Sequence, residues 1–169
     1  MSLTFRNLSL LGFLICAGGL GFAYLLEFAF GLAPCPLCIF QRIAMFAAAL
    51  AFLAGAIHNP VGWGRWGYSF LALIGAGAGV AIAGRHVWLQ HLPADQVPAC
   101  GPPLDYLLEI LPFTEVMRVV LRGDADCAKV DAAWLGLSLP AWTLIAFVAI
   151  ALYALVLPTL VKRSDKISQ

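Results

Sequence analysis

Long runs of apolar residues dominate the chain, and short polar segments separate them. Four of these runs are close to the roughly twenty residues that a helix needs to cross a hydrocarbon core, so they predict membrane-spanning helices. The predicted helices cover residues 8–30, 36–57, 66–84 and 141–161. We therefore expect an all-α membrane protein, a single domain built as a four-transmembrane-helix bundle.

The polar segments between these runs differ in length. The first outer link is short and holds no charged residue, whereas residues 85–140 form a long outer loop with most of the acidic residues. Within that loop, residues 104–120 carry apolar positions at mixed helical spacing, which predicts a piece that lies on the membrane surface. Basic residues flank the side that holds both termini, which favours cytoplasmic termini; these residues are Arg6, Arg65, Lys162, Arg163 and Lys166.

The composition agrees with a membrane location. Hydrophobic residues make up 62% of the chain and charged residues only 11%, with a mean hydropathy of +0.91. A soluble domain has about 25% charged residues. The formal net charge of +1 gives no reason to expect binding to nucleic acid.

Two cysteines stand between the first two apolar runs, in the motif Cys35-Pro36-Leu37-Cys38. Proline is well tolerated at the first position of a helix, so we expect Cys35 at the cap of the second helix and Cys38 in its first turn. The positive end of the helix and the cation of Arg42, one turn deeper, would both favour a thiolate on Cys38. The motif therefore predicts redox chemistry at a membrane surface.

The chain holds five cysteines. Cys16 falls inside the first predicted helix, where an apolar thiol is usually inert. The other four, Cys35, Cys38, Cys100 and Cys127, all fall on the outer face. They could form two structural disulfides, but the tiny loop that the first pair closes stabilises little. They could bind zinc, but Cys100 and Cys127 are 27 positions apart, so we expect no metal. We favour a third interpretation, two pairs that exchange disulfides.

Together, the four crossings, the early CxxC motif, Arg42 and the two loop cysteines resemble the DsbB family. Members of this family are quinone-dependent membrane oxidases that regenerate the periplasmic disulfide donor DsbA. The similarity runs over nearly the whole chain. Further family-like motifs are Arg85-His86-Val87-Trp88-Leu89-Gln90 and Trp134-Leu135-Gly136-Leu137-Ser138-Leu139-Pro140-Ala141-Trp142.

The resemblance implies a route for electrons. A reduced periplasmic DsbA-like protein would attack a Cys100–Cys127 disulfide and form a mixed disulfide with Cys100. Cys127 would then exchange with Cys35, and Cys38 would remain as the thiolate that faces a quinone. The resemblance also implies ubiquinone or menaquinone as the acceptor. It further implies a multi-pass protein of the bacterial inner membrane, with cytoplasmic termini and periplasmic redox cysteines.

Two more residues would face the quinone. Arg42 could stabilise negative charge on the ring oxygens, and His86 matches a family position near the quinone, where it could donate a hydrogen bond or a proton. The chain departs from the family at Gln41, where familiar members carry a glutamate, so no proton role of a carboxylate carries over. Pro36 between the cysteines fixes one backbone torsion and could change the potential of the pair.

Two other functions stay open from the sequence. A non-catalytic membrane scaffold would use the same cysteines as structural disulfides. A vitamin K epoxide reductase-like enzyme also joins a CxxC motif to a quinone within a small helical bundle. That class carries its CxxC motif late in the bundle, whereas Cys35 and Cys38 open the second helix here, so we rank it lower.

Overall fold

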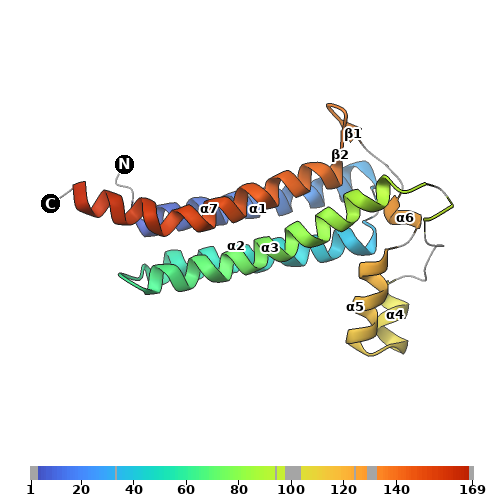
Figure 1. The fold of residues 1–169 in the computed structure, drawn as a ribbon, viewed down its shortest axis with the longest axis horizontal. Helices are drawn as coiled ribbons and strands as arrows, with labels where there is room; N and C mark the ends of the chain where they lie inside the picture. The colour runs from blue at the N-terminus through green and yellow to red at the C-terminus, as the bar shows by residue number, and fades with distance from the viewer. Residues whose placement is uncertain are drawn as a thin grey trace.

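The computed structural model describes residues 4–32, 34–93, 95–97, 104–123, 125–128 and 133–167. Four long helices dominate it, and each is long and apolar enough to cross a membrane. They are α1 (Phe5–Phe30), α2 (Pro36–His58), α3 (Gly64–Gln90) and α7 (Leu139–Ile167). They lie side by side along the long axis of the molecule (Figure 1). The predicted four-helix bundle is confirmed.

The helix ends follow from local residues. The side chain of Thr4 accepts a hydrogen bond from the backbone of Asn7 and so caps α1, and Gly31 ends this helix in the left-handed conformation at φ 66°. Pro36 is the first residue of α2 and Cys35 is its extended cap, as the sequence predicted. The CxxC motif therefore lies at the N-terminus of α2.

Several helix boundaries differ from the sequence prediction: α1 begins at Phe5 rather than at residue 8, and α7 extends to Ile167 rather than to residue 161. Helix α3 was expected to end near Gly84, but it continues for almost two more turns to Gln90. Helix α7 begins at Leu139 rather than at residue 141, because a proline such as Pro140 fits the first turn of a helix. The extension of α3 is the more important difference, because His86 lies on a rigid helix and not in a loop.

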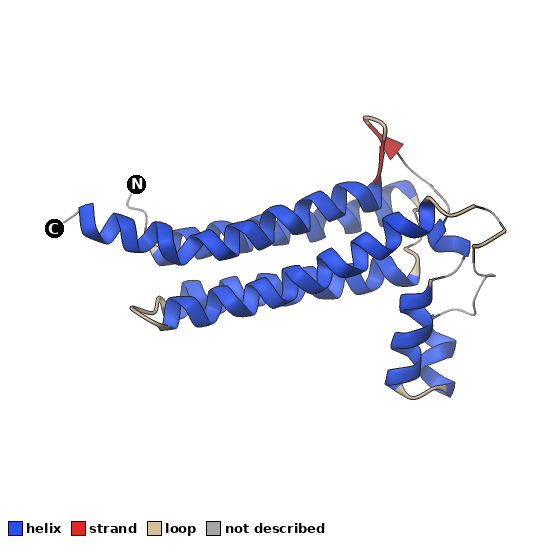
Figure 2. Cartoon of the chain, viewed as in Figure 1, coloured by secondary structure: helices blue, strands red, loops and turns tan. Residues whose placement is uncertain are grey.

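Short elements join α3 to α7 at the end of the bundle opposite to the termini (Figure 1). They are α4 (Leu104–Ile110), α5 (Phe113–Arg122), α6 (Ala125–Ala128), β1 (Ala133–Trp134) and β2 (Leu137–Ser138). The two strands form an antiparallel hairpin in which Ala133 pairs with Ser138. Figure 2 shows α4 and α5 as a pair of helices that stands off the axis of the bundle. Pro112 lies between the two helices and is the N-cap of α5.

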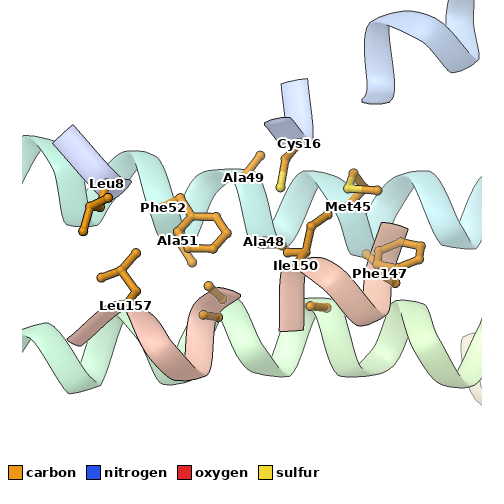
Figure 3. Close-up of a cluster of buried hydrophobic side chains, with 14 of the residues drawn as sticks. Leu8, Cys16, Met45, Ala48, Ala49, Ala51, Phe52, Phe147, Ile150 and Leu157 are labelled. Carbon is orange, nitrogen blue, oxygen red and sulfur yellow. The ribbon is translucent and has the colours of Figure 1, made fainter. Parts of the chain in front are cut away.

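Small residues let the long helices approach closely. A Cβ atom added at Gly75 would lie 2.9 Å from the backbone nitrogen of Ala48, and one added at Gly79 would lie 2.1 Å from the ring of Phe147. Gly77 has nothing within 4 Å of such a Cβ, so it lies outside this contact. Cys16 is fully buried in the same core, among the apolar side chains that Figure 3 shows.

Candidate functional site

Three cysteines and one histidine meet at the end of the bundle that carries α4 to α6. The sulfur atoms of Cys35 and Cys38 are 3.2 Å apart. His86 Nε2 lies 3.8 Å from the sulfur of Cys35, and His86 Nδ1 lies 4.0 Å from that of Cys38. Cys127 joins from α6, because its sulfur, that of Cys35 and a ring nitrogen of His86 all lie within 4.8 Å of one another. The arrangement brings the CxxC pair and a loop cysteine within reach of direct exchange.

A small hydrophobic core holds Cys127 in this place. Cys127 is only 1% exposed, and it belongs to a cluster of buried apolar residues from α2, α3, α4 and α5. The other buried members of this outer core are Leu37, Ile82, Leu89, Leu107, Val116 and Val120. Cys35 packs against the same core. Apolar burial therefore brings the two sulfurs together although they are far apart in the sequence.

Gln41 is a partner of His86 that the sequence interpretation missed. Both side chains are buried, at 5% and 3% exposure, and Gln41 Nε2 lies 3.2 Å from His86 Nδ1. When the amide donates this hydrogen bond, Nδ1 accepts it and the ring carries its proton on Nε2, which faces the sulfur of Cys35. The available signal was a polar residue inside an apolar helix, one turn from Cys38.

Arg42 is held by three groups of α1. Its guanidinium forms an ion pair with Glu27, donates a hydrogen bond of 3.3 Å to the carbonyl oxygen of Ala23, and lies 4.8 Å from the ring centroid of Tyr24. These three residues lie one turn apart or less on the same side of α1. Glu27 lies in the last turn of α1, and its carboxylate pairs with Arg42.

A cavity of about 350 Å³ lies beside the CxxC motif. Most of its wall is apolar and comes from α1, α2 and α7, while Cys38, Arg42 and His86 contribute polar groups. Further lining residues include Ala23, Leu26, Gln41, Met45, Gln90 and Trp142. Such a size and such a mixture of walls are typical of a site for a small apolar ligand that is oriented by a few polar groups.

The described part of the chain contains five of the six predicted site residues. Cys35, Cys38, His86 and Cys127 form the cysteine cluster, and Arg42 shares the cavity with Cys38 and His86. The sixth residue, Cys100, lies outside the described residues, so its pairing with Cys127 stays a prediction.

Four membrane-length helices with a cluster of cysteines at one end define a class of membrane proteins equipped for thiol chemistry. Comparison with known proteins narrows this class. The family model described as Disulfide bond formation protein DsbB matches residues 5–157. The chain therefore belongs to the DsbB family of membrane disulfide bond formation proteins, which confirms the resemblance seen in the sequence.

Individual relatives agree with this assignment. The chain is 52% identical over 146 residues to Disulfide bond formation protein B of Hahella chejuensis, a match that covers 86% of this chain and 88% of the relative. It is 53% identical over 152 residues to the protein of the same name from Xanthomonas campestris pv. campestris, with 89% and 88% covered. The corresponding protein of Xanthomonas axonopodis pv. citri is 50% identical over 163 residues, with 96% and 95% covered.

Proposed function

We propose that this protein is a membrane thiol:quinone oxidoreductase. It would reoxidise a periplasmic dithiol protein of the DsbA type and pass the electrons to ubiquinone or menaquinone. Membership of the DsbB family supports the part that concerns disulfide formation. The observation that carries the rest is that Cys38 borders an apolar cavity with Arg42 while its neighbour Cys35 lies beside Cys127.

The proposed thiol relay consists of successive exchanges. A thiolate of the partner attacks Cys100 of a Cys100–Cys127 disulfide, so a mixed disulfide forms and Cys127 leaves as a thiolate. Cys127 then attacks Cys35 of the Cys35–Cys38 disulfide, and Cys38 leaves as a thiolate. The partner's second thiolate would then attack the mixed disulfide, which releases the oxidised partner and a Cys100 thiolate, and Cys100 would attack Cys127 and free Cys35. Each exchange forms one S–S bond and breaks one. The approach of Cys127 to Cys35 supports the second exchange, since both sulfurs belong to the group that lies within 4.8 Å.

The residues around the cavity fit a quinone. When bound, a quinone would supply an acceptor for two electrons and two protons. The apolar walls would bind its ring and exclude water, while the cation of Arg42 would stabilise negative charge that develops on a ring oxygen. His86 would hold a proton near the cysteine sulfurs, and Gln41 would keep its ring oriented.

We further propose a location in the bacterial inner membrane, with both termini in the cytoplasm and the cysteines on the periplasmic side. The termini lie at one end of the bundle, and the short elements that carry Cys127 lie at the other (Figure 1). An oxidising compartment suits a site that delivers disulfides. The helices α4 and α5 would then lie near the membrane surface, in contact with lipid.

The test is turnover by the purified protein in detergent. With a reduced DsbA-type protein as donor and a soluble quinone analogue as acceptor, we expect quinone reduction that matches oxidation of the donor. Cys38→Ser should abolish it, whereas Cys16→Ser should retain it because Cys16 is buried in the bundle core. Full turnover by the Cys38→Ser variant would refute the mechanism.

Alkylation trapping separates this proposal from a structural scaffold. Under quinone starvation, an oxidoreductase accumulates reduced thiols at Cys35 and Cys38, and alkylation of these thiols shifts the protein on a gel. A scaffold keeps its cysteines oxidised whatever the supply of donor or quinone. Unchanged redox states under starvation would therefore count against catalysis.

A further inference from the structure

Arg85 ties the outer loop to α3. Its Nε donates a hydrogen bond of 3.1 Å to the carbonyl oxygen of Leu121, and its Nη2 donates one of 2.9 Å to that of Arg122. These are the last two carbonyl groups of α5, where the helix itself provides no donor. A cation at this end of a helix also interacts favourably with the helix dipole. The ring of Trp88, 4.1 Å from the guanidinium, covers Arg85.

The residue that follows α5 makes a second contact with α3. Gly123 has a φ of 79°, and a Cβ atom added there would lie 2.2 Å from Cδ1 of Leu89, which is fully buried. Arg85 and Leu89 are one turn apart and so lie on the same side of α3. The end of α5 is therefore held against the last two turns of α3 by the two hydrogen bonds of Arg85 and by the apolar contact between Gly123 and Leu89.

The chain segment that follows Gly123 carries Cys127, the loop cysteine of the proposed exchange. Helix α6 begins two residues after Gly123, packs against α3 and carries Cys127 (Figure 1). His86, next to Arg85 in the sequence, contacts the sulfur of Cys35 on the neighbouring side of α3. The same two turns of α3 thus hold the loop with one side and the CxxC site with another.

We propose that Arg85 is a positioning residue that docks the Cys127 segment onto α3 and thereby sets the effective concentration of Cys127 at Cys35. A sulfur on an undocked flexible loop would reach Cys35 at an effective concentration in the millimolar range. A docked sulfur that is oriented for attack reacts as if its concentration were far higher. This inference rests on the cysteine relay of the proposed function, but it involves neither the quinone nor the partner protein.

The test measures that effective concentration directly. In a Cys38→Ser, Cys100→Ser background, Cys35 and Cys127 are equilibrated with oxidised and reduced glutathione. Formation of the Cys35–Cys127 disulfide consumes one oxidised glutathione and releases two reduced ones. The fraction bridged, read by alkylation on a gel, gives the effective concentration. We expect Arg85→Gln to lower it about tenfold, as the loss of about 1.4 kcal/mol would do.

Matched controls separate docking from a general loss of structure. Arg118→Gln removes another arginine of the loop, whose carboxylate partner is the exposed Glu115, and should leave the value unchanged. Gly123→Ala weakens the docking from the loop side and should lower the value as Arg85→Gln does. Gly136→Ala is its control, since Gly136 also has a positive φ, of 80°, but nothing lies within 4 Å of an added Cβ.

The outcomes are distinct. A lower effective concentration of Cys127 at Cys35 in Arg85→Gln and Gly123→Ala, with both control variants unchanged, supports the docking. An unchanged value in Arg85→Gln and Gly123→Ala, or an equal fall in all four variants, overturns it. Absence of the disulfide in the parent background would overturn the cysteine relay itself and the docking with it. A defect confined to quinone reduction would not affect this assay.

Discussion

Gly75 lies where α3 packs directly on the backbone of α2. A Cβ atom added there would lie 2.9 Å from the nitrogen of Ala48, 3.2 Å from its Cα and 3.3 Å from the carbonyl oxygen of Ala44. All three are backbone atoms, so α2 cannot relieve the contact by rotating a side chain. Gly75→Ala therefore has to move one helix away from the other.

The size of the effect follows from these distances. The shortest contact is about half an ångström below the 3.4 Å at which ordinary van der Waals contact begins. Overpacking of this kind destabilises a protein by about 1–3 kcal/mol. Alanine also stabilises a helix by about 1 kcal/mol relative to glycine, so the measured loss of stability is smaller than the overpacking alone would cause. Gly77→Ala receives the same gain, but nothing lies within 4 Å of its added Cβ. The difference between the two variants therefore isolates the overpacking.

The assay is reversible unfolding in mixed detergent micelles, with the free energy of unfolding as the readout. We expect Gly75→Ala to be less stable than Gly77→Ala by about 1–3 kcal/mol. Gly75→Ala should also turn over more slowly, since displacing α3 moves His86 away from the cysteines on α2. Equal stability of the two variants would refute the reasoning, because it would mean that α2 and α3 do not pack as closely as the distances require.

Two further predictions concern the polar partners of the site. Glu27→Gln should lower the free energy of unfolding by less than about 1 kcal/mol, because the ion pair with Arg42 is partly exposed. In the reduced protein it should speed the reaction of Cys38 with iodoacetamide, because the charge of Arg42 is no longer neutralised; a slower reaction would contradict this. Gln41→Leu should lower the free energy of unfolding by about 1–3 kcal/mol, because a buried nitrogen of His86 loses its partner. Gln41→Glu keeps a partner and is the control in the same unfolding assay, and wild-type stability of Gln41→Leu would count against the hydrogen bond.

The sequence was most informative where a single segment determines the structure. Each membrane helix has its own apolar run, and Pro36 alone is enough to start α2 beside Cys35. The sequence prediction ended α3 too early because it followed the apolar run, which stops near Gly84. A helix can continue past an apolar run as long as no residue breaks its backbone hydrogen bonds. No proline follows Gly84 until Pro93, so the helix continues through polar residues to Gln90.

The sequence was less informative where two segments meet. The pairing of Arg42 with Glu27 and of His86 with Gln41 depends on how each helix is rotated about its axis, and residues along one helix do not reveal the orientation of its neighbour. Within one helix, by contrast, periodicity alone separates Gly77 from the glycines at the helix contact. Gly75 and Gly79 lie one turn apart on one side of α3, and Gly77 points elsewhere.

The two sides of the site are held by different kinds of contact, and the difference suits the proposed reaction. On the cavity side, groups from a membrane helix fix Arg42, and a buried hydrogen bond fixes His86, so the polar groups are set before an acceptor arrives. On the loop side, Cys127 is held by a small apolar core and by the half-buried Arg85. The hydrogen bonds of Arg85 are open to solvent, unlike the buried one between Gln41 and His86, so they exchange with water more easily. The proposed relay would use this asymmetry, since a preorganised acceptor side would speed electron transfer, whereas the loop would serve both the proposed partner protein and Cys35.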